Sequence, residues 1–318
     1  MTIRRLQIAE RRLQIGVLVA ICCAVGAAGC RRATPEAGAA KRPLVGVSLL
    51  TQTHAFYKEL EDGLREEAAV RHLDLVVVAC EMDPAKQAAQ IEDFVAQRVS
   101  AILVAPCDSN AIGADLAGPE RAHIPVFSAD IAVRTGHVVS HVASDNVQGG
   151  RLAARTLARL LSDRGRVLVI DQPEVASVQD RVRGFVEEMR NHPQITIVGR
   201  PSGSGQRAKA MAVMEDMLQA HRDLNGVFGI NDDSALGAAA VLESAGRKDV
   251  VVVGYDATPE AQAAIARGSP LKADVVQYPR KIGKTAIDII ARYLNGEKVE
   301  PLVAVGVGVV DAAGLGRQ

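Results

Sequence analysis

The chain has 318 residues, 48% of them hydrophobic, which is enough for two domains that each bury a core. Aromatic residues make up only 3% and Trp is absent, so the cores must consist of Val, Ile, Leu and Ala, as in parallel strands covered by helices on both faces. The formal net charge is zero, and the first 29 residues carry +3, which leaves about −3 for the remainder. This balance excludes the basic surface that nucleic-acid binding requires.

The N-terminal segment has the residue order of a secretory signal. Arginines precede an apolar run from Ile15 to Ala28, and small residues follow directly before Cys30. The apolar run is short for a permanent anchor. We expect a signal peptide over 1–29 and lipidation of Cys30, since small residues before a Cys resemble a bacterial lipoprotein cleavage box; an ordinary signal cut nearby and an uncleaved anchor are the alternatives. Residues 30–43, rich in Ala, Gly and Pro, predict a flexible tether.

From Leu44 onward, apolar strands and amphipathic helices alternate without a short repeat. Strands are expected over 44–50, 73–79, 101–104, 125–127, 137–142, 166–170, 195–198, 227–230, 250–253, 271–276 and within 301–310. Helices are expected around 56–64, over 84–97, near 109–122, and over 147–161, 177–190, 206–221, 234–245 and 282–294, with a further one starting at Pro259. The alternation predicts parallel sheets with right-handed crossovers, in two halves.

Two consecutive strand–loop–helix units each end their strand on a planar polar side chain. The strand over 227–230 is followed by Asn231, and the strand over 250–253 is followed by Asp256. Ser234 is expected to open the first helix, and Thr258 and Pro259 the second as N-cap and first helical residue. Ligands of open parallel sheets bind beyond the carboxyl ends of the strands, so both side chains are candidates for hydroxyl or amine recognition. The alternative is that both are turn or cap residues.

Three motifs in this order and spacing resemble the ribose-binding type of bacterial periplasmic binding protein. They are HVVSHVASDNVQGG from His137, VFGINDDSALGAAAVLESAG from Val227 and VVVGYDATPEA from Val251. The resemblance runs from about Leu44 to the C-terminus. It implies the type I periplasmic binding fold, in which two α/β lobes of doubly wound parallel sheet are joined by three hinge strands, with the ligand between them. Here it implies an N-terminal lobe of 44–144 plus 278–306 and a C-terminal lobe of 145–277 plus 307–318.

The resemblance also implies a set of ligand-contacting positions. Matched residue by residue, the set comprises His54, Phe56, Tyr57, Asp130, Arg181, Asn231, Asp256 and Gln277. The aromatic rings could cover the C–H faces of a sugar, with core packing as the alternative role. The carboxylates would accept hydrogen bonds from hydroxyls, and the guanidinium and amides would donate to them. For Arg181 the alternative is a surface charge at a helix start, where a cation is unfavourable.

Four positions depart from the ribose-binding pattern, one of them Gly205 or Ser204, which lies where an aromatic residue is expected. Ala105 and His54 each stand where an Asn is usual, and Ile131 replaces an Arg. The N-terminal lobe is therefore expected to offer fewer polar groups. We expect ribose to bind poorly, because hydroxyls buried against Ala105 and Ile131 would lack partners.

The resemblance implies an exported, lipid-anchored binding protein of the periplasm or cell surface. Its expected partners are a small hydroxyl-rich ligand, such as a monosaccharide or polyol, and the membrane permease of an ABC importer; the alternative is a sensor that presents its closed form to a receptor or histidine kinase. We expect a monomer with no cofactor, no metal and no catalytic residues, since nucleotide, hydrolase and metal-ligand motifs are missing from the sequence. A sugar-responsive repressor would need a DNA-binding segment before residue 44, where the signal lies instead.

Cys80 and Cys107 both follow strands of the first lobe. An exported protein could join them, but the strands they end are not expected to be neighbours. We therefore expect two free thiols.

Overall fold

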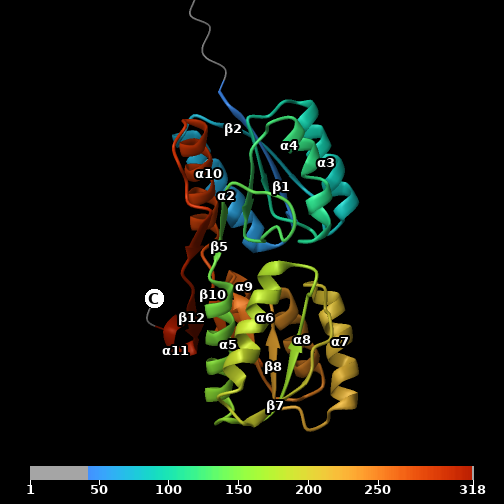
Figure 1. Ribbon diagram of the computed structural model, residues 1–318. Helices are drawn as coiled ribbons and strands as arrows, with labels where there is room; N and C mark the ends of the chain where they lie inside the picture. The colour runs from blue at the N-terminus through green and yellow to red at the C-terminus, as the bar shows by residue number, and fades with distance from the viewer. Residues whose placement is uncertain (1–41, 317–318) are drawn as a thin grey trace, which may run out of the picture. The chain divides into compact units, whose positions relative to one another are not determined.

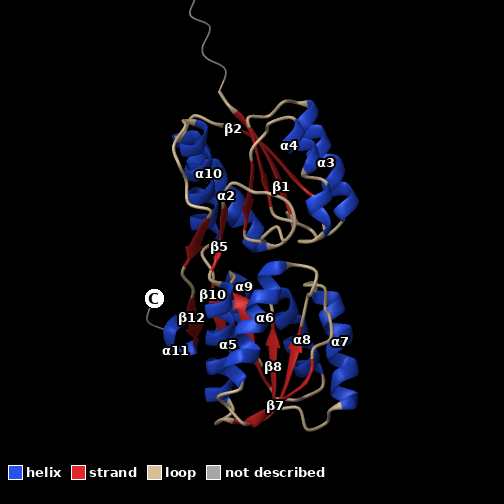
Figure 2. Cartoon of the chain, viewed as in Figure 1, coloured by secondary structure: helices blue, strands red, loops and turns tan. Residues whose placement is uncertain are grey.

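The computed structural model describes residues 42–316; the predicted signal peptide, most of the predicted tether and Cys30 lie outside the described residues. Figure 1 follows the described chain from blue to red through two α/β lobes. Each lobe contains one six-stranded sheet. Helices cover both faces of each sheet (Figure 2), so Val, Ile, Leu and Ala fill the core as the composition predicts.

The first lobe has the strand order β11-β5-β4-β3-β1-β2, and every pairing in it is parallel. Its elements are β1 (Leu44–Leu49), α2 (Ala55–Val70), β2 (Asp74–Ala79), α3 (Pro84–Ala96), β3 (Ala101–Val104), the 3₁₀ turn η1 (Ala111–Ala114), α4 (Ala117–Arg121), β4 (Val126–Ala129), β5 (His141–Ser144), α10 (Pro279–Leu294) and β11 (Leu302–Val305).

The second lobe has the equivalent order β12-β10-β9-β8-β6-β7, with β12 antiparallel to β10. Its elements are α5 (Asn146–Leu160), β6 (Arg164–Ile170), α6 (Ala176–Met189), β7 (Gln194–Gly199), α7 (Arg207–Ala220), β8 (Gly226–Gly229), α8 (Asp232–Ser244), β9 (Val251–Asp256), α9 (Pro259–Ala266), β10 (Leu271–Val276), β12 (Gly308–Asp311) and α11 (Ala312–Leu315).

The chain crosses between the sheets three times. It leaves the first sheet after β5 at Asp145, returns after β10 through Gln277 and Tyr278, and crosses again between β11 and β12 at Gly306. The first lobe therefore needs residues from the C-terminal part of the chain. Helix α10 packs along α2 at such close range that a Cβ on Gly63 would lie 2.2 Å from the carbonyl oxygen of Arg280.

Several boundaries differ from the sequence prediction for local reasons. The predicted helix at 109–122 is split into η1 and α4, because Gly113, Gly118 and Pro119 interrupt it. The apolar run 301–310 forms two strands in different sheets, separated at Gly306. Helix α8 begins at Asp232 and not at Ser234; the N-cap is Asn231, whose side chain accepts from the Ser234 amide. The caps predicted for Thr258 and Pro259 are confirmed.

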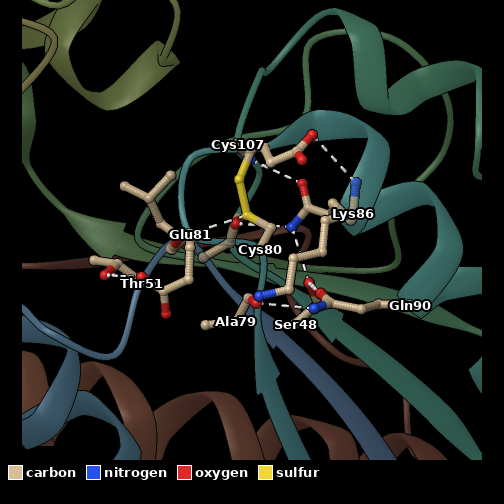
Figure 3. Close-up of a disulfide and its surroundings, with 12 residues drawn as sticks. Ser48, Thr51, Ala79, Cys80, Glu81, Lys86, Gln90 and Cys107 are labelled. Atoms are coloured by element: carbon tan, nitrogen blue, oxygen red, sulfur yellow. Dashed lines mark hydrogen bonds between the residues drawn. A yellow bond between two sulfur atoms is a disulfide. The ribbon is translucent and has the colours of Figure 1, made fainter.

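Cys80 and Cys107 form a disulfide, so the prediction of free thiols is wrong. Their strands β2 and β3 are indeed not neighbours, because both pair with β1 from opposite sides. Beyond the end of β1, however, the two loops converge: the Cys80 amide donates to Leu49 and the Ala105 amide to Ser48, which brings the two cysteine Cα atoms to 6.7 Å (Figure 3). The strand order alone did not account for these loop paths.

Within residues 42–316 no helix is both long and apolar enough to cross a membrane.

Candidate functional site

A cavity of about 290 Å³ is lined by residues of both lobes at the carboxyl ends of their strands. All eight predicted contact residues lie in its wall: His54, Phe56, Tyr57, Asp130, Arg181, Asn231, Asp256 and Gln277. Ligand pockets typically measure about 300–1,000 Å³, so this cavity suits a small ligand.

The first lobe supplies an aromatic wall and one carboxylate. Phe56 and Tyr57 open α2 and pack edge to face with ring centroids 5.2 Å apart. The Tyr57 hydroxyl donates to Asp130 Oδ2 at 2.6 Å. Asp130 directly follows β4 at φ +63°, and Ile131 beside it adds a buried apolar surface. Both aromatic residues are nearly buried and also line the cavity, so core packing does not exclude the predicted contact with a ligand.

His54 connects the two lobes across the cavity. It is the N-cap of α2, and its Nδ1 accepts from the Phe56 amide at 3.2 Å. This bond assigns the proton of a neutral ring to Nε2, which lies 3.6 Å from Asp256 Oδ2. His54 is therefore positioned to pair with a carboxylate of the second lobe.

Arg181 is buried, with 3% of its surface exposed, and lies in the second turn of α6. The alternative reading of a surface charge at the helix start is therefore wrong. Its guanidinium stacks 3.4 Å above the Tyr255 ring, donates to Asn146 Oδ1 at 2.9 Å and also donates to the Ile230 carbonyl. These contacts fix the orientation of the planar group beside the cavity, which offsets the unfavourable placement of a cation near a helix N-terminus.

The polar residues of the second lobe follow the ends of adjacent strands. Asn231 follows the end of β8, and its Nδ2 donates to the Gly205 carbonyl at 3.0 Å. Asp256 ends β9 and accepts from Gln277 Nε2 at 2.7 Å. Gln277 lies in a hinge crossing, and its buried Oε1 has no hydrogen-bond partner among the described residues. Asn231 therefore combines the cap role and the cavity position that the sequence left open.

The two buried carboxyls have raised pKa values. Burial raises the pKa of Asp130 to about 6, against the Tyr57 hydrogen bond and the Arg181 charge, which lower it. Burial also raises the pKa of Asp256, while His54 and Arg181 oppose the shift. The pKa of Tyr57 is raised well above its ordinary value by burial and by Asp130, so its hydroxyl remains a donor. The cavity thus combines one buried guanidinium with two carboxyls whose charged forms are disfavoured by burial, a set that offers both donors and acceptors to ligand hydroxyls.

The fold and the cavity agree with a family match. A model described as a periplasmic binding protein domain matches residues 45–298. The chain belongs to the periplasmic binding protein family. It is 33% identical to the ribose import binding protein RbsB of Escherichia coli (strain K12) over 279 residues, which cover 87% of this chain and 94% of that protein.

Two solved structures of ABC transporter solute-binding proteins have the same fold as this periplasmic binding protein. The protein from Agrobacterium vitis with bound α-D-tagatopyranose has a TM-score of 0.82 at 28% identity and covers 86% of this chain and 96% of its own. The protein from Mycobacterium smegmatis with bound glycerol has a TM-score of 0.82 at 34% identity, covering 87% and 96%. The type I fold implied by the sequence motifs is confirmed.

The cavity of this periplasmic binding protein also contains residues that the sequence prediction missed. They include Glu81, Met82, Gln172, Gln206, Arg207 and Asp233. Gln172 could have been found, because it follows the strand β6 just as Asn231 follows β8. No sequence pattern pointed to Glu81 and Met82. Both residues have positive φ values, 52° and 65°, and this turn after Cys80 brings them to the cavity.

Ala105 does not belong to the cavity wall that residues 42–316 form. Its carbonyl oxygen accepts from Gln87 Nε2 at 3.1 Å, behind the loop that carries Cys107. The Ala105 side chain therefore cannot deprive a ligand in the cavity of a hydrogen-bond partner, whereas Ile131 does line the cavity. Among the described residues there is also no cluster of three or more His, Cys, Asp or Glu that could hold a metal ion.

Proposed function

We propose that this periplasmic binding protein captures a small sugar or sugar-like polyol in the cavity between its lobes and delivers it to an ABC importer. The observation that carries the proposal is the convergence of buried carboxyl, guanidinium and amide groups from both lobes with two aromatic rings in one small cavity. The likeness to a ribose import protein and to a tagatose-bound solute-binding protein supports the ligand class.

Each proposed contact follows from the chemistry of its side chain. Asp130 and Asp256 accept hydrogen bonds from ligand hydroxyls, and Arg181 donates from the free part of its fork. Asn231, Gln277 and His54 complete the polar set. Phe56 and Tyr57 cover an apolar ring face. These roles require binding and no chemical step on the ligand, so we propose that the protein is not an enzyme and acts as a monomer without cofactor.

We propose further that the chain is exported and held at a membrane through lipidated Cys30, with residues 1–29 removed. The order of arginines, apolar run, small residues and Cys supports this proposal. A Cys30→Ser protein should lose the lipid mass and leave the membrane fraction. If it keeps the mass of the parent and stays membrane-bound, the anchor is not at Cys30.

A thermal-shift screen against pentoses, hexoses, polyols and nucleosides tests the ligand class. A ligand that binds only the folded state stabilises it by RT ln(1 + [L]/Kd), about 4 kcal/mol at 1,000 Kd. Calorimetry on the hits gives Kd, and a screen in which no hydroxyl-rich ligand shifts Tm contradicts the proposal. Uptake is favoured over sensing by the import function in the name of the relative; loss of uptake of the identified ligand in a deletion strain tests it.

We also propose that ligand binding closes the lobes on their hinges, because a ligand between the lobes gains its full set of contacts only when both engage it. Small-angle X-ray scattering should show a smaller radius of gyration at saturating ligand. An unchanged radius argues for a binding site that is already shut without ligand.

A further inference from the structure

Behind Asp256, on the side away from the cavity, lie two more buried carboxyls, Asp232 at the start of α8 and Asp274 in the middle of β10. Asp274 is fully buried, although β10 lies next to the edge strand β12. It occupies the space above Gly254, its register partner on β9, where a Cβ would lie 2.5 Å from Asp274 Oδ2. The lack of a side chain at Gly254 therefore makes room for a carboxyl inside an otherwise apolar layer.

Both carboxyls hold the backbone that follows Asp256. Asp274 Oδ1 accepts from the Ala257 amide at 3.2 Å, and Asp232 Oδ2 accepts from the Thr258 amide at 2.7 Å. The turn they hold is strained, because Asp256 and Ala257 adopt φ values of +123° and +59° although neither is glycine. Such residues cost about 1–3 kcal/mol each and persist only when their surroundings fix them.

The remaining oxygen of each carboxyl lacks a partner. Asp232 Oδ1 and Asp274 Oδ2 are buried without a hydrogen bond from any group in residues 42–316. The two carboxyls accept from the adjacent amides of Ala257 and Thr258, and each perturbs the pKa of the other through side-chain hydrogen bonding, so a single proton between them satisfies both oxygens. Asp232 is the better site for the charge, since it stands in the first turn of a helix and its hydrogen bond from the Thr258 amide, at 2.7 Å, is shorter than the 3.2 Å bond from the Ala257 amide to Asp274.

The charges and burial around the pair favour a state in which one of the two carboxyls keeps its proton. Burial raises the pKa of Asp232 to about 6, and burial together with the Asp232 charge raises the pKa of Asp274 well above its ordinary value. The other charged groups near the pair are Asp256, which disfavours a second negative charge, and Asp233, which is paired with Arg207. His54 and Arg181 act on Asp256 from its cavity side. On the edge strand β12, the residue paired with Asp274 is the apolar Val310.

We propose that Asp232 and Asp274 share one proton and act as positioning residues, which together hold the Asp256–Thr258 turn so that the Asp256 carboxylate points into the cavity. The predicted effect of the pair on ligand affinity rests on the proposed sugar-binding function, whereas the shared proton does not depend on that function. The ligand-contacting carboxylate of the second lobe is then aimed by a buried acid pair that never touches the ligand.

The test compares Asp274→Asn with Asp274→Ala. The amide variant keeps an acceptor for Ala257 and a donor for Asp232, so it reproduces the protonated state permanently. The alanine variant leaves the Ala257 amide without its acceptor. We expect Asp274→Ala to weaken the best ligand of the screen about tenfold through faster dissociation, and Asp274→Asn to restore the affinity of the parent. Asp216→Asn, an exposed change on α7, is the matched control for removing a charge.

The shared proton is tested by measuring Tm as a function of pH in the absence of ligand. Because the folded pair keeps a proton that the unfolded chain releases near pH 4, the stability of the parent falls as pH rises above that value. Asp274→Asn cannot lose this proton, so the Tm of the parent should fall relative to Asp274→Asn by roughly 2–4 °C per pH unit between about pH 5 and the pKa of the folded pair. Asp216→Asn should follow the parent.

Each outcome decides one statement. Parallel Tm–pH curves for the parent and Asp274→Asn overturn the shared proton. Unchanged affinity in Asp274→Ala overturns the positioning role, and so does an Asp274→Asn protein that binds as weakly as Asp274→Ala. If the parent binds no sugar or polyol, the proposed function fails and the positioning role fails with it, while divergent Tm–pH curves still establish the proton.

Discussion

The two lobes place an aspartate at the same point of equivalent sheets but surround it differently. Asp130 follows β4 and Asp256 ends β9, the fourth strand in the orders β2-β1-β3-β4-β5-β11 and β7-β6-β8-β9-β10-β12, and both residues have positive φ. Asp130 is held by one phenol and lies beside Ile131. Asp256 is held by Gln277, the Asp232 amide and the turn behind it. Topology thus determines where a carboxylate reaches the cavity, and its neighbours determine how firmly its orientation is fixed.

The lobes also differ in how their cavity walls are stabilised. The first lobe ties the loops around its wall with a disulfide, and Glu81 beside Cys80 accepts from Thr51 Oγ1 at 2.7 Å (Figure 3). The second lobe relies on buried polar contacts around Arg181 and Asp256. Covalent constraint and buried hydrogen bonding are alternative means of fixing a binding surface, and each can be removed separately.

Removing the disulfide should have the largest effect, confined to the first lobe. The bond joins residues 27 positions apart, and cross-links of this span stabilise a protein by about 3–4 kcal/mol. We expect a Cys80→Ser/Cys107→Ser protein to lose stability of about that size in denaturant titrations, with faster amide exchange in β1, β2 and β3. Parent protein treated with reductant is the control. Equal loss of protection in both lobes would show that they unfold as one unit.

Arg181→Ala tests the buried polar contacts of the second lobe. The change should weaken the best ligand by about 1.5–3 kcal/mol, the value of a hydrogen bond to a charged group. It should also lower the stability of the free protein, because Asn146 Oδ1 and the Ile230 carbonyl lose their donor. Arg183→Ala, whose exposed ion pairs contribute at most about 1 kcal/mol, is the matched control two residues away. Calorimetry with unchanged affinity for Arg181→Ala would remove it from the site.

Ribose affinity tests the apolar character of the first lobe. A ribose hydroxyl buried against Ile131 without a partner costs about 1–3 kcal/mol, so ribose should bind roughly 5- to 150-fold more weakly than the best ligand. Ala105 contributes nothing to this prediction, because it does not line the cavity formed by the described chain. Submicromolar ribose binding in calorimetry would mean that another group, such as Glu81 or Gln172, supplies the missing bond.

The pH dependence of binding tests the hydrogen bond from Tyr57 to Asp130, the one side-chain hydrogen bond that this carboxyl accepts from residues 42–316. Of the four predictions, this one has the smallest expected effect. In the proposed site Asp130 accepts from ligand hydroxyls more strongly when ionised, and burial raises its pKa to about 6, so affinity should fall as pH drops below that value. Tyr57→Phe removes a hydrogen bond that lowers this pKa, so the fall should begin at higher pH, with a loss of about 1 kcal/mol near neutrality. A titration curve with the same midpoint in both proteins would show that Asp130 does not govern the change.

The alternation was predicted well because it depends on local patterns, whereas the two-lobe fold and the eight residues of the cavity wall followed from the match to the family. Asn231, Asp256 and Gln277 stand directly after apolar strands, where a parallel sheet opens its ligand edge. Arg181 was selected by its match to the family and lies in the cavity wall, but its stacking on Tyr255 joins residues 74 positions apart. No local pattern reports such a pair.

The errors have the same origin. The disulfide formed because two loops converge past the end of β1, and strand order says nothing about loop paths. Ala105 was expected at the cavity because it matches a ligand-contact position of the family, yet its carbonyl oxygen accepts from Gln87 and its side chain does not line the cavity. Asp274 stood in an apolar strand without any sign that Gly254 opposite it leaves space for a carboxyl.

The three crossings between the sheets also determine the order in which the chain can fold during synthesis. The first lobe begins with β1 at residue 44 but is completed by β11, which ends at residue 305. Until α10 has been made, the face of α2 around Gly63 that receives it remains uncovered. The lobe that the ribosome starts first is therefore finished almost last, and a nascent chain has no complete domain until nearly all of it has been translated.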